Sequence, residues 1–216
     1  MTEPSVTLRS FIAVALPGAV QTEIANAVRE LARALPGVRW SKKPENLHVT
    51  TKFLGPVAID RLDAIGAALD EALADVGPFE IALGGWGAFP SPRSARVVFV
   101  AVDDVVDEDV DDGADDDIDD DADDGVGAGS LTQVAEIVEA VSERFGFPRE
   151  KRRFTGHVTV GRAKENVDAR DALAREADRT FGRVKVDEVH IYESHLGRGG
   201  STYVLRHRAP LSARAN

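Results

Sequence analysis

The sequence His-Val-Thr occurs twice in this chain, each time within a stretch typical of a β-strand. The first copy stands in NLHVTTKFLG at 46–55, and the second stands in TGHVTVGRA at 155–163. Side chains alternate between the two faces of a strand. His48 and Thr50 therefore share one face, as do His157 and Thr159, while the valine between each pair points to the opposite, apolar face. The fold must provide two half-buried strands that each carry an imidazole beside a hydroxyl.

The hydrophobic pattern around the two copies predicts helices and strands in a similar order. Each half of the chain has a helix, a His-Val-Thr strand, another helix and then two strands. We therefore predict an α+β fold of two pseudo-symmetric lobes, each an antiparallel sheet with outer helices, around a central cleft that carries both His-x-Thr motifs. The expected strands are 8–16, 36–40, 47–54, 79–89, 95–102, 153–162, 183–194 and 201–211, and the expected helices are 19–35, 58–76, 131–147 and 168–178.

One segment departs from this pattern. Residues 103–124 hold 14 Asp and one Glu with no Lys or Arg, whereas the other 194 residues hold 26 basic and 22 acidic side chains. Such a self-repelling stretch with little apolar content is typical of disorder. Its Asp repeats do not fit a calcium loop, because glycine stands seventh rather than sixth. We expect a single bilobal domain over 1–216, with 103–129 as a disordered acidic insert, and we expect that residues 103–127 can be deleted without loss of folding or catalysis.

Composition excludes several classes of function. The 216 residues include no cysteine, so disulfides, thiolate catalysis and Cys-ligated metals are excluded. The start of the chain lacks a signal-peptide pattern and no long apolar run occurs, so we expect a cytoplasmic protein. A zinc site would need His48 and His157 with one of His190, His195 or His207. The spacing of these residues is not that of metal ligands, and we expect no metal and no cofactor.

The two motifs indicate acid–base chemistry. Two imidazoles can act as one acid and one base near neutral pH. Two threonine hydroxyls can hydrogen-bond the oxygens of an anion. If the two motifs converge, this set suits hydrolysis of a phosphodiester without a metal. Two alternatives remain open: a module that binds RNA ends or nucleotides without turnover, and a phosphodiesterase for a small cyclic nucleotide.

Four stretches carry a resemblance to a known family. They are RWSKKPENLHVTTKFLG at 39–55, FPSPRSARVVFVAV at 89–102, GHVTVGR at 156–162 and VHIYESHLGRGGSTYVL at 189–205. Together they resemble the two-histidine (2H) phosphoesterases, and most of all the RNA 2′,3′-cyclic phosphodiesterases that are also called 2′-5′ RNA ligases. The resemblance covers nearly the whole chain outside the acidic segment.

The resemblance implies a reaction and roles for five residues. It implies hydrolysis of RNA 2′,3′-cyclic phosphate ends to 2′-phosphomonoesters, with 2′-5′ ligation as the reverse reaction. His48 is implied as the proton donor and His157 as the proton acceptor, with the phosphate held by Thr50, Thr159 and Arg162. The implied partner is RNA, including tRNA-derived ends, and we expect a monomer.

Strict alternation would turn Arg162 away from the cleft, so a bulge at Gly161 is needed to turn it back. The family usually has proline before its second histidine, where this chain has Gly156.

Other side chains have weaker signals. Tyr192 and Tyr203 are candidates for base stacking, with packing the favoured interpretation. Lys52 is expected on the face of His48, at the rim, and Trp40 and Phe53 are expected in the core. The basic run at 151–153 is a candidate contact for RNA phosphates. His190, His195 and His207 are expected to be structural or surface residues.

Overall fold

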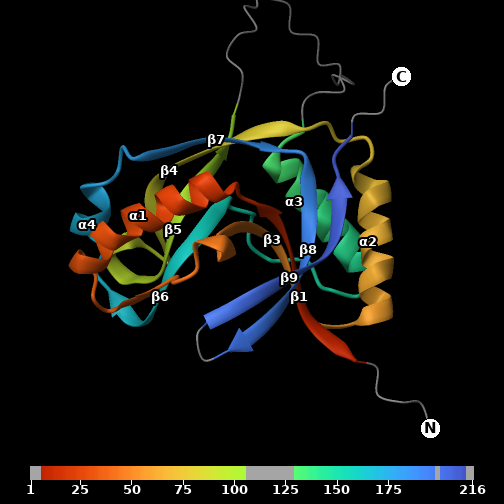
Figure 1. The fold of residues 1–216 in the computed structure, drawn as a ribbon, viewed down its shortest axis with the longest axis horizontal. Helices are drawn as coiled ribbons and strands as arrows, with labels where there is room; N and C mark the ends of the chain where they lie inside the picture. The colour runs from red at the N-terminus through yellow and green to blue at the C-terminus, as the bar shows by residue number, and fades with distance from the viewer. Residues whose placement is uncertain (1–5, 106–128, 198–199, 213–216) are drawn as a thin grey trace, which may run out of the picture.

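The computed structural model describes residues 6–105, 129–197 and 200–212 (Figure 1). Most elements lie where the hydrophobic periodicity predicts them. The strands are β1 (Thr7–Ala15), β2 (Val38–Trp40), β3 (His48–Ala58), β4 (Phe79–Phe89), β5 (Ala95–Asp104), β6 (His157–Val167), β7 (Thr180–Val186), β8 (Glu188–Gly197) and β9 (Gly200–Pro210). The helices are α1 (Gly18–Ala34), α2 (Ile59–Leu73), α3 (Leu131–Arg144) and α4 (Arg170–Ala174), with short 3₁₀ turns η1 (Pro44–Asn46) and η2 (Pro92–Ser94).

All nine strands of the described residues join in one curled sheet in which every pair is antiparallel. The order is β7-β4-β5-β6-β3-β1-β8-β9, with β2 added beside β6. The two His-Val-Thr strands, β3 and β6, meet in the middle. We call β3, β1, β8 and β9 the His48 lobe, and β6, β5, β4, β7 and β2 the His157 lobe. The predicted α+β class, with antiparallel sheets and outer helices, is confirmed.

The lobes are not the two halves of the chain. Hairpin β4–β5 follows β3 in sequence but pairs with β6, and hairpin β8–β9 follows β6 but joins β1 in the His48 lobe. Each lobe is thus completed by strands from the other half.

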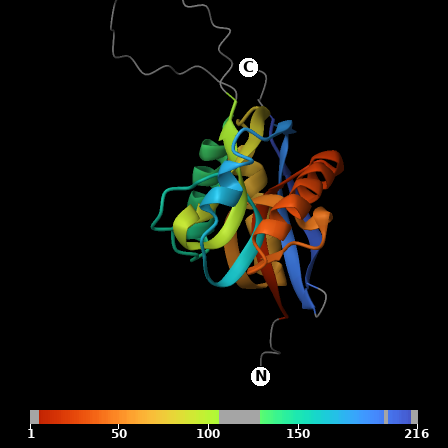
Figure 2. The same ribbon diagram turned by 90° about the vertical axis from the view of Figure 1, so that its left-hand side faces the viewer.

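The helices cover both sides of the sheet. Helix α1 packs near α4 and β7 at the His157 lobe, and α2 and α3 pack together against β3 and β9 at the His48 lobe. Figure 2 shows α1 and α3 on opposite sides of the strands. In α1 the buried side chains recur at helical spacing, which directs one apolar stripe inward. Helix α4 ends earlier than predicted because the chain turns near Ala177 and pairs as β7 from Thr180 onward.

The acidic segment begins later than its composition suggests. Asp103 and Asp104 belong to β5, and the Asp104 carboxylate accepts a hydrogen bond of 2.6 Å from the backbone N–H of Leu131. The Ser130 hydroxyl accepts from the N–H of Gln133, so two free donors at the start of α3 are satisfied. The remainder of the expected insert, 106–128, lies outside the described residues. Within the described ranges, no helix is long and apolar enough to span a membrane.

Candidate active site

The two histidines are brought together by the central strand pair. Val49 of β3 is directly opposite Val158 of β6, and both valines are fully buried. In this antiparallel register His48 stands alongside Thr159, and Thr50 stands alongside His157. Because neighbours of the valines point to the other face, all four polar side chains lie on one side of the seam. The convergence predicted for the two motifs is therefore present.

Both imidazoles are held in the same orientation. Nδ1 of His48 donates to the carbonyl oxygen of Asn46 at 2.7 Å, and Nδ1 of His157 donates to that of Thr155, also at 2.7 Å. A carbonyl can only accept, so the neutral rings carry their proton on Nδ1 and leave a lone pair on Nε2. The Nε2 of His48 accepts from the Thr50 hydroxyl at 2.9 Å.

Aromatic rings fix the positions of the imidazoles. Phe11 stacks on His48 at a centroid distance of 4.8 Å, and Tyr203 lies edge-on to the same ring at 5.3 Å. His157 lies edge-on to Phe89 at 5.2 Å and is tilted against Phe99 at 5.3 Å.

This burial lowers the pKa of both histidines. Burial, and then the charge of nearby His157, lower the pKa of His48 to about 4, although the hydrogen bond to Asn46 opposes the change. Burial, and then the charge of Arg162, lower the pKa of His157, opposed by the hydrogen bond to Thr155. Both rings are therefore neutral in the free protein at pH 7.

A bulge in each His strand decides which later side chains face the cleft. In β3, Ile12 is opposite Lys52 and Ala13 is opposite Thr50, so Thr51 is an extra residue. In β6, Val98 is opposite Gly161 and Phe99 is opposite Thr159, so Val160 is the extra residue. The bulge expected at Gly161 thus lies one residue earlier. It has the expected effect, because Arg162 turns toward the cleft.

The bulge at Thr51 makes two sequence predictions wrong. Lys52 does not share the face of His48; it is buried and forms an ion pair with Glu139. Phe53 is not in the core; its side chain is 59% exposed and lines the cleft. Phe53 and Arg162 occupy equivalent positions, five residues after each histidine, so the pseudo-symmetry ends there.

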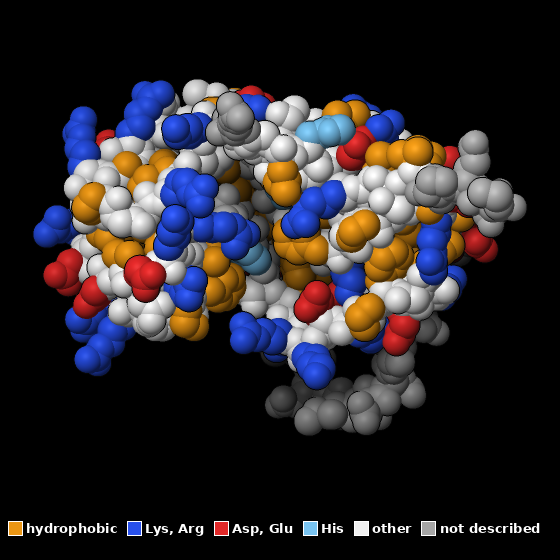
Figure 3. All heavy atoms as spheres, turned by 90° about the horizontal axis from the view of Figure 1, so that it is seen from below, with side chains coloured by type: hydrophobic (Ala, Val, Ile, Leu, Met, Phe, Trp, Pro, Cys, Tyr) orange, Lys and Arg blue, Asp and Glu red, His pale blue; other side chains and the backbone are white. Residues whose placement is uncertain are grey.

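A groove of about 810 Å³ runs past these residues. His48, Thr50, Thr159 and Arg162 line it, while His157 lies beside it. Figure 3 shows a hollow on this face with a histidine in it and Lys and Arg side chains around it. The groove-lining cations are Arg9, Arg39, Lys42, Lys43 and Arg162, and none of the described lining residues is acidic. The site therefore favours an anionic ligand. The basic run at 151–153 is exposed but is not part of the lining.

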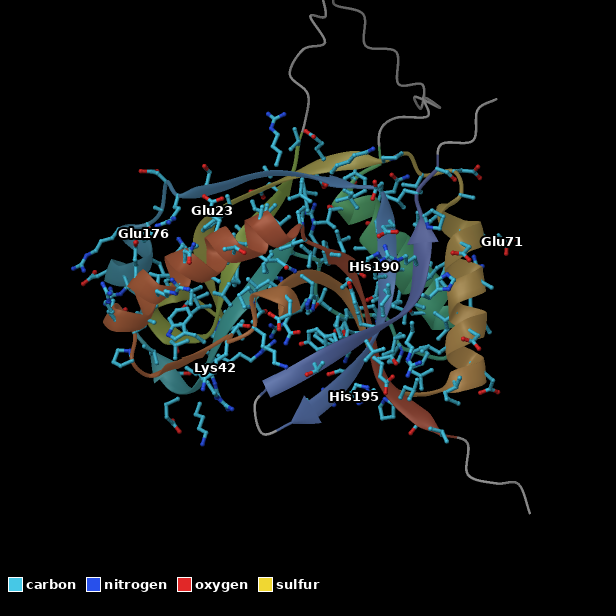
Figure 4. The ribbon with its side chains drawn as sticks, viewed as in Figure 1. Glu23, Lys42, Glu71, Glu176, His190 and His195 are labelled. Carbon is cyan, nitrogen blue, oxygen red and sulfur yellow. The ribbon has the colours of Figure 1, made fainter. Side chains whose placement is uncertain are left out.

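The remaining histidines have structural partners, as expected. His190 is buried and bonds Tyr192 and Glu188, and His207 bonds Asp70. His195 lies further along β8 beside Glu193 (Figure 4). In the part of the chain that the structure describes, no cluster of three or more His, Asp or Glu is placed to hold a metal.

Several residues at the site could not be singled out from the sequence. Phe11, Phe89 and Phe99 read as ordinary core positions, and only strand pairing places them against the histidines. Tyr192 and Tyr203 are half-buried in the same aromatic cluster, which agrees with the favoured packing interpretation. Trp40 is half-buried and lines the groove. At Gly156, a Cβ atom would lie 2.6 Å from the Val102 carbonyl oxygen, so the close packing of β5 favours glycine here.

Two proteins of similar sequence carry the same name. A protein of Archaeoglobus fulgidus named RNA 2′,3′-cyclic phosphodiesterase is 31% identical over 199 residues, which are 91% of this chain and 96% of that protein. A protein of Aeropyrum pernix with the same name is 34% identical over 164 residues, 74% of this chain and 78% of that protein.

The fold is also that of solved structures. The structure of TT0787 of Thermus thermophilus matches with a TM-score of 0.71 at 23% identity, and the match covers 96% of this chain and 100% of that chain. E. coli LigT complexed with 3′-AMP matches with a TM-score of 0.66 at 22% identity, covering 95% and 98%. A model of the 2′-5′ RNA ligase superfamily matches residues 17–198. The chain belongs to the 2′-5′ RNA ligase superfamily.

Proposed function

We propose that this protein hydrolyses RNA 2′,3′-cyclic phosphate ends to 2′-phosphomonoesters by acid–base catalysis between its two histidines. The observation that carries the proposal is the seam at Val49 and Val158, which sets two imidazoles and two hydroxyls on one face. The family membership and the names of its relatives support the same substrate.

Each polar side chain is assigned one task. His157 Nε2 takes a proton from water as the water oxygen attacks phosphorus. The bond from phosphorus to the 3′ oxygen breaks, and His48 Nε2–H gives that oxygen its proton. Thr50, Thr159 and Arg162 hold the phosphate oxygens and stabilise the charge that develops on them. The strained ring needs little beyond this positioning and proton transfer.

If His48 is the proton donor, its pKa must be higher in the substrate complex than in the free protein. In the free protein His48 has a pKa of about 4 and is mostly neutral at pH 7. A phosphate anion next to the ring favours its protonated form, so substrate binding must raise this pKa for His48 to serve as the acid. Once protonated, a ring surrounded by Phe11 and Tyr203 releases its proton readily.

Ligation to a 5′-hydroxyl would use the same groups. A 5′-hydroxyl in place of water would attack the cyclic phosphate and give a 2′-5′ linkage with no nucleotide consumed. We propose RNA ends, including tRNA-derived ends, as substrates, and a cytoplasmic monomer as the acting form. In this proposal the chain over 1–216 acts as a single domain.

The test uses an RNA oligonucleotide with a 2′,3′-cyclic phosphate end, incubated with the protein in excess EDTA. The expected product is the 2′-phosphate, resolved from the 3′-phosphate by chromatography. His157→Gln is the matched inactive control. Tight binding without any product would identify a binding module instead. Turnover of small cyclic nucleotides without turnover of the RNA would identify a phosphodiesterase for small cyclic nucleotides. Activity that is lost in EDTA and restored by zinc would contradict the metal-free mechanism.

A further inference from the structure

Two arginines stand directly opposite each other at one end of the groove. Arg39 of β2 is the cross-strand partner of Arg162 of β6. Both side chains are exposed and both line the groove. Side chains directly opposite on neighbouring strands approach closely, and like charges in such a pair are destabilising. The resemblance to the family assigns a role to Arg162 only, so Arg39 has no role so far.

The described residues do not neutralise the charge of this pair. Among the residues that the structure describes, no carboxylate lies within ion-pairing distance of either guanidinium. Arginines away from the groove are commonly paired, for example Arg170 with Asp168 and Arg179 with Glu176. Two opposed and unpaired guanidinium groups form a site for an anion, since each can donate two parallel hydrogen bonds to phosphate oxygens.

The segment after Arg39 continues the positive charge. Lys42 and Lys43 follow β2 and line the same groove, and the Lys43 amine donates to the Thr202 hydroxyl of β9 at 2.7 Å. Figure 4 shows Lys42 on this loop, on the side of the molecule where the β8–β9 hairpin extends. One wall of the groove, residues 39–43, is therefore basic from Arg162 back toward His48.

We propose that Arg39 is a specificity residue that holds the phosphodiester next to the cyclic end of the RNA, beside the cyclic phosphate held by Arg162. The cyclic phosphate carries one negative charge and is already provided with two threonines and Arg162. A second guanidinium beside Arg162 suits a second anion, which an RNA chain has and a cyclic mononucleotide lacks. This inference rests on the proposed function and makes a chain, rather than a single nucleotide, the preferred substrate.

The experiment compares three substrates: 2′,3′-cyclic CMP, a trinucleotide that ends in the same cyclic nucleotide, and that trinucleotide with an uncharged methylphosphonate at its last internucleotide linkage. Arg39→Gln should lower kcat/KM about 10–100-fold on the charged trinucleotide, the loss expected for a hydrogen-bonded charge. The loss should be at least about tenfold smaller on cyclic CMP and on the methylphosphonate. Arg29→Gln, which removes an exposed cation on α1 outside the groove, should change none of the three.

Three outcomes would overturn the inference. Equal losses on cyclic CMP and the trinucleotide would place Arg39 on the scissile phosphate. An unchanged kcat/KM on the trinucleotide would show that Arg39 does not bind the substrate. A fall in the Tm of Arg39→Gln would indicate a structural role, because relief of the repulsion with Arg162 should leave the Tm equal or higher. Failure of the wild-type protein on all three substrates would instead contradict the proposed function itself.

Discussion

The Nζ atom of Lys52 lies 2.7 Å from Oε2 of Glu139 and also donates to the carbonyl oxygen of Pro148 at 2.7 Å. This contact ties the His strand β3 to α3 and to the loop that leads into β6. The Lys52 side chain is 2% exposed and that of Glu139 is 17% exposed. The ion pair is thus a mostly buried link between β3 and α3.

Breaking this link should destabilise the fold. Lys52→Met leaves the Glu139 carboxylate without its partner in a mostly buried site, which costs about 3 kcal/mol in the free energy of unfolding. Urea denaturation measures the change. The matched control is Arg149→Met, which breaks the exposed pair with Glu143 and should cost less than about 1 kcal/mol. Equal effects of the two changes would contradict a buried role for Lys52.

The roles of the histidines can be separated by changing the leaving atom. His48→Gln and His157→Gln should each lower kcat about 10²–10⁴-fold, the usual effect of one general acid or base. In a substrate with sulfur in place of the bridging 3′ oxygen, the leaving group departs as a thiolate and needs little protonation. This substrate should restore most of the activity of His48→Gln and little of that of His157→Gln. The opposite pattern of rescue would exchange the two roles.

The buried imidazoles should move the pH optimum to the acid side. The reactive free protein needs one protonated and one neutral histidine, so kcat/KM peaks between their two pKa values. Burial lowers both from 6.5, that of His48 to about 4. A lowered pKa means that the proton is lost at lower pH, so kcat/KM should peak below pH 6.5 and decline toward pH 8. Rates measured from pH 4 to 8 at low substrate concentration check this. A plateau extending above pH 7.5 would argue against it.

The acidic segment should be dispensable between Val105 and Gly129. The Asp104 carboxylate already bonds the Leu131 N–H, so the two ends of the segment lie side by side. Loop length affects closure entropy only logarithmically, and a short Gly-Ser join should leave Tm and kcat unchanged. The removed residues 106–128 carry 12 Asp and one Glu, so KM for RNA should fall at low salt and converge with that of wild type as salt rises.

A longer deletion provides the control for that experiment. Removing 103–127 also takes away Asp104 and its bond to the start of α3, which should cost about 1 kcal/mol of stability. A large loss of kcat in the shorter deletion, with the fold retained, would show that the segment takes part in the site.

The sequence was sufficient to place the histidines but not all of their neighbours. The alternation of His48, Val49 and Thr50 is a local property, and its repetition at 157–159 predicts a shared cleft. The extra residues Thr51 and Val160 have no local signal, because neither type is special to bulges. The reversal of Lys52 and Phe53 follows from a bulge that only the pairing with β1 reveals.

Local patterns also could not predict which distant strands pair. Arg39 and Arg162 lie opposite each other because the three-residue strand β2 pairs with β6, and the two arginines are 123 positions apart in the chain. The aromatic support of His48 depends on β8 and β9, which come from the far end of the sequence. Such contacts are set by the topology of the sheet and by the burial of the valines at its centre, not by the composition of either segment.

The exchange of hairpins between lobes has a consequence for how the chain reaches its native state. After synthesis of the first 105 residues, β1–β3 and β4–β5 form two separate ladders, because the strands that complete them, β8 and β6, have not yet been made. Their open edges are exposed to wrong partners during that time. The His157 lobe has all its strands once β7 has been made, whereas the His48 lobe must wait for β8 and β9, so both lobes are completed late in synthesis and through contacts of high contact order.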